Sequence, residues 1–350
     1  MKTITIQTAK QYQVLIGTDL LCKLGSYVAQ IQPGCKAAII SDTNVWPLYG
    51  DEVSDSLVSA GCVPISYVFP AGEASKNAAT YLEILNFLAE NRITNADLII
   101  ALGGGVVGDI SGFAAATFLR GIDYIQVPTS LLAMVDSSVG GKTAIDLPAG
   151  KNLVGAFKQP RLVLCDVSVL ATLPRSQFLD GCAEVIKYGV LYDKDLFSYL
   201  MEAGPQFDRE DVIAKCIGFK RDVVQLDEFD TGARQRLNLG HTIGHGIEAG
   251  SNFQITHGQA VAAGMAIVTK AAVSSGLCAE ETYLSICAIL KQFSLPTGTS
   301  FCARELHHAA LSDKKRSGST VKLIIPRDIG SCDIIPMPVS ELESFIEAGL

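Results

Sequence analysis

The sequence predicts an α/β domain with a mostly parallel, doubly wound sheet, followed by a mainly α-helical domain. Three observations support this prediction. Strand-like and helix-like segments alternate up to about residue 174, helical periodicity dominates from residue 175, and a glycine cluster directly follows a buried apolar run. Strands that alternate with helices are typical of parallel sheets. We therefore divide the chain into an α/β domain of residues 1–174 and a helical domain of residues 175–350.

Short segments in the first half have the residue pattern of β-strands. The first two alternate polar and apolar residues, which predicts an N-terminal hairpin and not a signal peptide. The later ones are apolar runs that end at polar residues, proline or glycine. The expected strands are Thr3–Ile6, Gln13–Ile16, Ala37–Ser41, Val63–Phe69, Asp97–Leu102, Tyr124–Val127 and Leu162–Cys165. A helical period is present over Lys76–Asn91.

The second half has a different pattern, in which apolar residues recur at helical spacing. The expected helices are Gln177–Leu191, Asp195–Met201, Arg209–Leu226, Leu237–Ala249, Gly258–Ser275 and Glu280–Phe293. Only Val321–Ile325 has the composition of a strand. This change of pattern predicts a second domain whose core is formed mainly between helices.

The composition excludes several classes of protein. The chain of 350 residues has 28 basic and 36 acidic side chains, and a net charge of −8 argues against a nucleic-acid partner. Its ten cysteines are scattered without a CxxC motif, which is typical of free thiols in a reducing compartment. The apolar runs are all shorter than the ~18 residues that a membrane span needs. We therefore expect a soluble cytoplasmic protein.

A glycine-rich segment follows the expected strand that ends at Leu102. Gly103, Gly105 and Gly108 fit the pattern GxGxxG, in which the backbone can approach a pyrophosphate and the next helix offers amide donors. The pattern also fits a tight turn between two core elements. Asp42 and the segment Gly72–Lys76 follow other expected strands and could complete a nucleotide site, although each also has the pattern of a helix cap or a surface charge.

Histidines are concentrated in one short region. His241, His245 and His257 lie within seventeen residues, and the first two share one face of an expected helix. A catalytic metal site often uses three protein ligands from His, Glu and Asp. Glu184, which shares a helix face with Lys187, could complete such a set. Hydrogen-bonded histidines and a simple Glu–Lys ion pair are the alternatives. We interpret His307 and His308 as surface residues.

Several cations and glycines indicate an anionic ligand. The segment Asp136–Thr143 presents Lys142 after two glycines, but it lacks the first glycine of a P-loop at the required distance. Lys151 follows closely and Lys220 lies further along the chain, ahead of the histidine pair. Arg234 and Asn238 also precede that pair. Together with a candidate metal and a glycine loop, these side chains predict an anionic substrate.

Long motifs make the chain similar to a known enzyme family. The segments GGGVVGDISGFAAATFLRGIDYIQVPTSLLAMVDSSVGGKTAI, GKNLVGAFKQP, GCAEVIKYG and LNLGHTIGHGIEA occur in order and closely resemble the 3-dehydroquinate synthases. The resemblance covers almost the whole chain. It implies a homodimeric carbon–oxygen lyase of the shikimate pathway that uses catalytic NAD and a divalent metal, zinc or cobalt.

The implied reaction converts 3-deoxy-D-arabino-heptulosonate 7-phosphate to 3-dehydroquinate and phosphate. A ring hydroxyl is oxidised, phosphate is eliminated, the ketone is reduced again, the ring opens and an aldol closure forms the carbocycle. The resemblance assigns Glu184, His241 and His257 as metal ligands, and His245 as the proton relay. Lys142, Lys187 and Glu184 join His245 as implied catalytic residues.

The resemblance also implies two binding sets. NAD would contact Asp42, Glu73, Lys76, Gly104, Gly105, Val106, Gly108, Asp109, Thr129, Ser130, Asp136, Lys142 and Lys151. The substrate would contact Asp136, Lys142, Lys151, Asn152, Lys187, Lys220, Arg234, Asn238, His245, His257 and one of Lys314 and Lys315. Arg120 matches a residue that reaches into the neighbouring subunit's site in the family.

The sequence departs from the family pattern at Ser130, Met134 and Asp146, where threonine, glutamine and asparagine are usual. Three alternatives compete with this interpretation: a sibling cyclase for sedoheptulose 7-phosphate or glucose 6-phosphate, a metal-dependent polyol dehydrogenase, and a non-enzymatic NAD-binding module. Lys220, Arg234, Asn238 and His245 keep the residue types of the dehydroquinate synthases, which argues against a sibling cyclase. A polyol dehydrogenase would not need so many cations, and a binding module has no physical reason to keep the metal and proton-relay residues.

Overall fold

The computed structural model describes residues 1–251, 254–311 and 319–350, and for residues 310 and 311 it describes the backbone only. The chain forms two compact units. Unit 1 contains Met1–Pro174 and Arg209–Phe229, and unit 2 contains Arg175–Asp208 and Asp230–Leu350. The units therefore differ from the sequence-based division at residues 209–229, which the periodicity had grouped with the helical half.

Contacts with the N-terminal strands explain the place of this segment. Helix α7 (Arg209–Leu226) carries Asp211, which forms an ion pair with Lys2. Near its C-terminus, the Gln225 side chain accepts a hydrogen bond of 2.8 Å from the backbone N–H of Gln7. Periodicity identifies the helix correctly but contains no information about the surface on which it packs.

The sheet of unit 1 is parallel except at one edge, which confirms the predicted fold class. Its strand order is β1-β2-β9-β6-β5-β3-β4, and only β1 runs antiparallel to its neighbour. The strands are β1 (Lys2–Ile6), β2 (Tyr12–Gly17), β3 (Lys36–Asp42), β4 (Val63–Phe69), β5 (Leu98–Gly103), β6 (Asp123–Pro128) and β9 (Leu162–Asp166).

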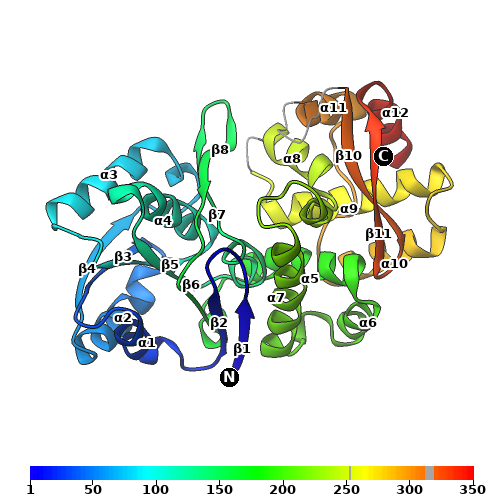
Figure 1. Cartoon of the computed structure of the whole chain (residues 1–350). Coiled ribbons are helices and arrows are strands. Elements are labelled where there is room, and N and C mark those ends of the chain that lie inside the picture. Colours follow the sequence, from blue (N-terminus) through cyan, green and yellow to red (C-terminus); the bar gives the residue numbers. More distant parts are fainter. Residues whose placement is uncertain (252–253, 312–318) are drawn as a thin grey trace. The chain divides into compact units, whose positions relative to one another are not determined.

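Helices cover both faces of this sheet. Figure 1 shows α1 (Leu24–Ile31) and α2 (Trp46–Ser59) on one face, and α3 (Ala78–Glu90) and α4 (Gly105–Thr117) on the other. The core under α3 and α4 is formed by buried aliphatic side chains of the strands and of both helices. Continuous apolar strands such as β5 are required here because each strand is buried on both faces.

The chain order reverses between β3 and β5. These two strands are neighbours, yet the chain continues from β3 outward to β4 and from β5 in the opposite direction to β6. In open α/β sheets ligands bind beyond the carboxyl ends of the strands at such a reversal. The ends of β3 and β5, at Asp42 and Gly103, are therefore the expected binding edge of unit 1.

A second, antiparallel hairpin of unit 1 was not expected from the sequence. Strands β7 (Lys142–Leu147) and β8 (Gly150–Phe157) pair directly after Gly140 and Gly141, which have φ angles of +97° and +70°. A strand, and not a helix, thus begins at the lysine of the Gly-Gly-Lys-Thr sequence. This agrees with the rejection of a P-loop, whose function depends on a helix N-terminus after the glycines.

Unit 2 is mainly helical, as predicted. Its helices are α5 (Arg175–Tyr192), α6 (Lys194–Ala203), α8 (His241–Gly250), α9 (His257–Ser274), α10 (Glu280–Gln292), α11 (Ala303–Leu311) and α12 (Val339–Gly349). The single strand expected at 321–325 is one half of the hairpin β10 (Thr320–Asp328) and β11 (Ser331–Pro338). Prolines in β11 obscured its strand pattern, and α11 and α12 were not anticipated.

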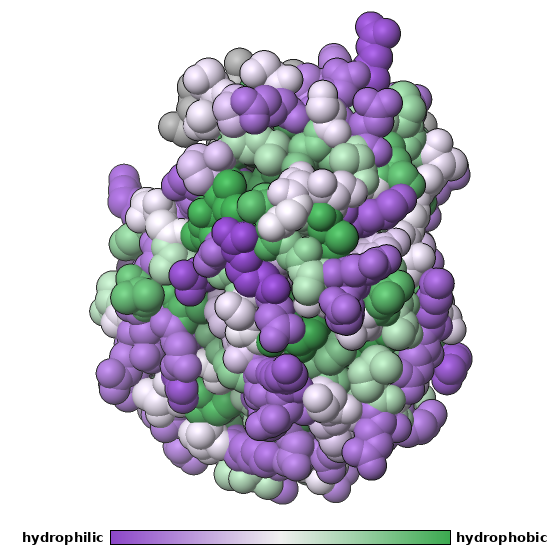
Figure 2. Space-filling view, turned by 90° about the vertical axis from the view of Figure 1, so that its right-hand side faces the viewer, coloured by the Kyte–Doolittle hydropathy of each residue, from purple (hydrophilic) through white to green (hydrophobic). Residues whose placement is uncertain are grey.

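The outer surface of unit 2 is mixed in character. Figure 2 shows hydrophilic residues interspersed with smaller hydrophobic areas, which is ordinary for a protein surface. Within the described residues, the helices all fall short of the combined length and apolarity needed to cross a membrane.

Candidate active site

The candidate metal ligands of unit 2 are presented by a buried central helix and two glycine-packed helices. Helix α5 is buried along its C-terminal half, and Glu184 and Lys187 are 0% and 1% exposed there. The two residues lie one turn apart, and their carboxylate and ammonium groups form an ion pair. The Lys187 ammonium also donates a hydrogen bond of 2.8 Å to the Leu237 carbonyl oxygen.

Glycines allow α8 and α9 to approach at backbone distance. A Cβ on Gly264 would lie 2.1 Å from the Gly240 carbonyl oxygen, so a side chain there is incompatible with this packing. Gly240 itself has a φ of +78°, a left-handed conformation that glycine adopts readily. This residue makes α8 begin at His241, whereas the periodicity had predicted a helix from Leu237.

A cap fixes the position of His257. This histidine is the first residue of α9, after an N-cap at Thr256 and within a capping box completed by Gln259. The Asp180 carboxylate on α5 accepts hydrogen bonds from the Thr256 hydroxyl and, at 3.1 Å, from the Gln259 backbone N–H. The start of α9 is therefore tied to the helix that carries Glu184.

These elements bring three of the predicted ligands together. The Nε2 atoms of His241 and His257 lie 3.5 and 3.4 Å from the same carboxylate oxygen of Glu184. Ligand atoms of the three residues all lie within 4.8 Å of one another, as a shared metal ion requires. The structure thus assembles Glu184, His241 and His257 from three separate helices.

The other ring nitrogens indicate which tautomers the histidines adopt. His241 Nδ1 lies 3.0 Å from the Leu239 carbonyl oxygen, and His257 Nδ1 lies 3.3 Å from a carboxylate oxygen of Glu248. Both partners are acceptors, so each Nδ1 carries the proton of a neutral ring whose Nε2 side is taken by a metal ion. The Nε2 lone pairs then point toward Glu184, which is the arrangement found at histidine metal ligands.

The electrostatics of His257 also favour a bound cation. Partial burial disfavours its imidazolium form, but hydrogen bonds to Glu184 and Glu248 outweigh this effect and raise the pKa of His257 to about 10. The donor set, two nitrogens and a carboxylate oxygen, is the one that zinc-type ions prefer.

His245 lies beside this set but is not part of it. Its ring centroid is 5.5 Å from that of His241 and 6.4 Å from that of His257. It forms a second possible group with Glu248 and His257. A histidine at this distance can exchange protons with a molecule bound at the three ligands.

Further predicted residues of unit 2 lie in the turn that precedes α8. Arg234 and Asn238 belong to the 3₁₀ helix Ala233–Asn238, with Arg234 2% exposed and Asn238 partly buried. His308 is exposed as expected, whereas His307 is partly buried and its Nε2 lies 3.2 Å from the Val339 carbonyl oxygen. Lys314 and Lys315 lie outside the described residues.

The binding edge of unit 1 gathers many residues of the predicted NAD set. Gly104 follows β5 as the N-cap of α4, and the Thr129 backbone N–H after β6 donates to the Gly103 carbonyl oxygen at 3.0 Å. Asp42 ends β3, where its carboxylate accepts hydrogen bonds of 2.8 and 2.9 Å from the backbone N–H groups of Asn44 and Val45. These bonds close a turn ahead of α2, whose N-cap is Val45 without a side-chain cap, and the contact of Asp42 with NAD stays a prediction.

Lys76 is the centre of a polar network at this edge. Its ammonium lies 2.6 Å from the Asp109 carboxylate on α4 and donates a 2.6 Å hydrogen bond to the Asn152 side-chain oxygen on β8. Glu73 lies 3.9 Å from Lys76 and 3.4 Å from Lys151. Burial lowers the pKa of Lys76, but attraction to Asp109 and Glu73 outweighs it and raises the pKa above its ordinary value.

The remaining predicted cations of unit 1 differ in their surroundings. The buried Lys220 ammonium on α7 lies 2.7 Å from the Asp136 carboxylate, so these two predicted residues form an ion pair. Lys142, at the start of β7, is exposed. Arg120 is also exposed and has a φ of +67° in a turn after α4.

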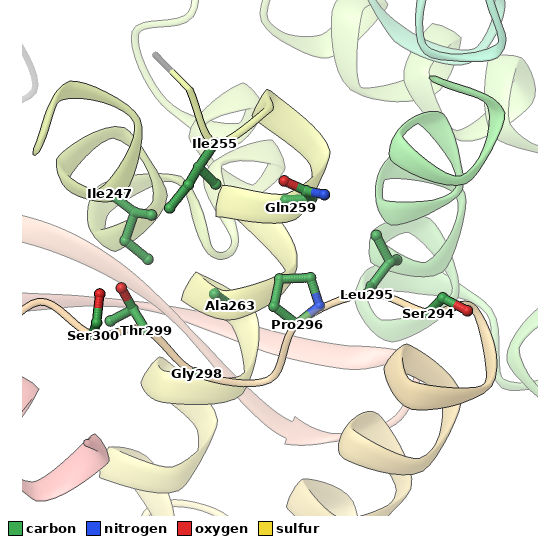
Figure 3. A pocket seen from close by; sticks show the side chains of 10 residues that line it. All are labelled: Ile247, Ile255, Gln259, Ala263, Ser294, Leu295, Pro296, Gly298, Thr299 and Ser300. Atoms are coloured by element: carbon green, nitrogen blue, oxygen red, sulfur yellow. The ribbon is translucent and has the colours of Figure 1, made fainter. Parts of the chain in front are cut away.

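A cavity of about 500 Å³ in unit 2 contains none of the predicted site residues. Figure 3 shows Ile247 and Ile255 above the segment that carries Pro296 and Thr299. No predicted role depends on this cavity.

Two family models match consecutive parts of the chain. The model described as 3-dehydroquinate synthase N-terminal matches residues 66–180, and the model described as 3-dehydroquinate synthase C-terminal matches residues 181–316. The chain belongs to the 3-dehydroquinate synthase family. The matched segments contain the glycine loop and the three-ligand set, so family membership rests on the regions that carry the site.

Individual relatives agree with this membership. The 3-dehydroquinate synthase of Clostridium acetobutylicum is 42% identical and covers 99% of both chains. That of Clostridium botulinum is 46% identical over 92% of this chain and 93% of its own. A solved structure of 2-deoxy-scyllo-inosose synthase with carbaglucose-6-phosphate, NAD+ and Co2+ is 25% identical, with a TM-score of 0.90 over 100% of both chains.

Sequence reasoning missed two residues that shape the site. Glu248 shares a helix face with His241 and His245, at intervals of seven and three residues, and this spacing could have identified it. Asp180 lies one turn before Glu184 and gives no such signal, because its partners Thr256 and Gln259 are distant in sequence.

Proposed function

We propose that this protein converts 3-deoxy-D-arabino-heptulosonate 7-phosphate into 3-dehydroquinate and phosphate, and that the residues assembled in its two units carry this reaction. The observation that supports the assignment most directly is the set of Glu184, His241 and His257 in a chain that belongs to the family. The reaction combines a transient oxidation with phosphate elimination, re-reduction, ring opening and aldol closure. No net oxidation results, so NAD is recycled.

Two groups complete the proposed site. The related inosose synthase was solved with NAD+ and Co2+, and this chain has a fitting donor set for a divalent ion and a fitting sheet edge for a dinucleotide. When bound, zinc or cobalt supplies a Lewis acid for the substrate hydroxyls, and NAD accepts and later returns a hydride. Glu184, His241 and His257 would hold the metal.

Protein groups of known position would handle protons and anions. His245 would relay the proton of the reacting hydroxyl, because it adjoins the three ligands without belonging to them. Lys187 would bind substrate oxygens, since its ammonium is already held in place by Glu184 and the Leu237 carbonyl. The phosphate of the substrate can itself remove the proton that elimination requires, so no strong protein base is needed.

The remaining predicted contacts form two groups. At the edge of unit 1, NAD would be bound by Asp42, Glu73, Lys76, Gly104, Gly105, Val106, Gly108, Asp109, Thr129, Ser130, Asp136, Lys142 and Lys151. The anionic substrate would be bound by Asp136, Lys142, Lys151, Asn152, Lys187, Lys220, Arg234, Asn238, His245, His257 and Lys314 or Lys315. These cations outnumber the acids of the second set, which suits a substrate with a carboxylate and a phosphate.

The protein would act as a cytoplasmic homodimer. The ten cysteines are all free thiols, as expected for a reducing compartment. Arg120 projects from an exposed turn, where its side chain would be available to a second subunit. The substitution Arg120→Ala separates assembly from activity. Sedimentation should show that the dimer persists, while phosphate release should show that turnover falls.

One assay tests the proposed reaction. The purified protein, given the heptulosonate phosphate with substoichiometric NAD and zinc, should release phosphate in many turnovers without lasting absorbance at the NADH band. Steady accumulation of NADH would indicate a polyol dehydrogenase. Turnover of sedoheptulose 7-phosphate or glucose 6-phosphate alone would indicate a sibling cyclase, and failure with all three substrates would leave a binding module.

Two substitutions test the division of roles. His241→Ala should abolish metal binding, because it removes one of three protein ligands. His245→Ala should retain the metal and lose turnover by about 10²–10⁴-fold, the usual contribution of a positioned acid or base. Metal content measured by atomic absorption, together with phosphate release, checks both. Equal loss of metal in the two variants would contradict the assignment.

A further inference from the structure

We propose that Glu248 is a positioning residue that holds His257 in the tautomer and ring orientation needed for metal binding. This inference rests on the proposed function, because it concerns the same metal. Glu248 lies in the last turn of α8, its side chain is 3% exposed, and none of the roles above is assigned to it. A carboxylate is rarely buried unless a specific partner stabilises its charge.

One partner of Glu248 is His257. The imidazole of His257 lies between two carboxylates, with Nε2 3.4 Å from Glu184 and Nδ1 3.3 Å from Glu248. An ionised carboxylate can only accept a hydrogen bond, so when a metal ion takes the Nε2 side, Glu248 holds the remaining proton of the neutral imidazole on Nδ1. Nε2 is then left with its lone pair directed at the metal position.

His241 achieves the same result with a different acceptor. Its Nδ1 is paired with the uncharged carbonyl oxygen of Leu239 at 3.0 Å, within its own turn of chain. His257 is the first residue of α9, and the acceptor of its Nδ1, Glu248, belongs to the neighbouring helix α8. Glu248 therefore also links α8 to α9.

The negative charge of Glu248 has a separate effect. A carboxylate that accepts from Nδ1–H increases the electron density that the imidazole offers through Nε2, and it stabilises a cation beyond the ring. A neutral amide in its place keeps the hydrogen bond but loses this charge. The contributions of orientation and of charge can thus be separated by comparing two substitutions.

The main experiment measures metal affinity. Glu248→Gln should weaken the binding of Zn2+ by about 10-fold and Glu248→Ala by about 100-fold, the range found for partners of metal-bound histidines. Competition with a chelator of known affinity gives both constants, and circular dichroism shows whether each variant is folded. Glu202→Gln, an exposed glutamate of α6, is the matched control and should bind Zn2+ as the unsubstituted protein does.

A spectroscopic measurement makes the test independent of the variants. The chain has five histidines, so ¹⁵N-histidine labelling of the zinc-loaded protein resolves the protonation of each ring. His257 should carry its proton on Nδ1 and show a metal-bound Nε2. In Glu248→Ala this single-tautomer pattern should be lost at His257 and kept at His241. A protonated Nε2 of His257 in the unsubstituted holoenzyme would overturn the proposal even if the variants did not fold.

The outcomes separate the inference from the function on which it rests. Retention of Zn2+ by His241→Ala would refute the assigned ligand set and, with it, both proposals. Loss of Zn2+ in His241→Ala, combined with unchanged affinity in both Glu248 variants, would overturn only the positioning role. Complete loss of Zn2+ in Glu248→Gln would indicate that Glu248 is itself a ligand, as the second group of His245, Glu248 and His257 would allow. This result would also overturn the positioning role.

Discussion

The close packing of α8 against α9 makes Gly264 a sensitive position far from any reacting atom. In Gly264→Ala the new methyl group would lie 2.1 Å from the Gly240 carbonyl oxygen, whereas ordinary contact begins at 3.4 Å. The methyl group is fixed to the backbone of α9, and the oxygen belongs to the backbone at the N-cap of α8. Neither can move without its helix. We expect α8 to withdraw from α9 by about 1 Å, as overpacked cores relax through backbone shifts.

This displacement has two measurable consequences. Overpacking costs about 1–3 kcal/mol, which corresponds to a fall in Tm of about 3–10 °C for a unit of this size. His241 directly follows Gly240, so the same shift moves one ligand relative to Glu184 and His257. Sites of this kind tolerate errors of about 0.5 Å, and a shift of 1 Å reduces turnover by about 100-fold.

Calorimetry and metal titration measure these effects. Gly218→Ala on α7 is the matched control, because a Cβ there meets nothing within 4 Å. Alanine in a helix interior is favoured over glycine by about 0.5–1 kcal/mol, so the control should be slightly stabilised. Unchanged Tm and unchanged zinc affinity in Gly264→Ala would refute the view that the glycine contact sets the position of His241.

Three further predictions follow from individual contacts. Burial raises the pKa of the Asp146 carboxyl, so folding favours its protonated form and its ionisation costs stability at neutral pH. Asp146→Asn should therefore raise the urea midpoint at pH 7. This gain should vanish below about pH 4, where Asp146 is protonated in the unfolded chain as well. Asp146→Ala should lack the gain, because it removes the acceptor that lies 2.7 Å from the Asn152 backbone nitrogen. Lys220→Met should destabilise the protein by about 1–3 kcal/mol by removing the partner of Asp136, and a second substitution, Asp136→Asn, should restore part of the loss in denaturant unfolding. Zinc at a hundredfold excess over its Kd should stabilise the protein by about 2.7 kcal/mol, whereas His241→Ala should show no such increase in calorimetry.

Local patterns in the sequence identified much of the fold and part of the site. Apolar strand runs and helical periods predicted the parallel sheet and the helical second half, because burial and periodicity act over a few residues. The glycine cluster after β5 also appeared where expected, with Gly104 at the start of α4. Two of the three candidate ligand helices were placed correctly, while α8 begins later than predicted because of the left-handed Gly240.

The sequence by itself determined which residue types were available: a carboxylate, a group of histidines, a glycine loop and a set of cations. Only the tertiary structure decided which of them meet. It joined Glu184 to His241 and His257, paired Lys220 with Asp136, and placed α7 in unit 1. It also supplied Glu248 as the acceptor for His257. These contacts connect residues far apart in the chain, and they depend on the packing between elements, which a local pattern does not encode.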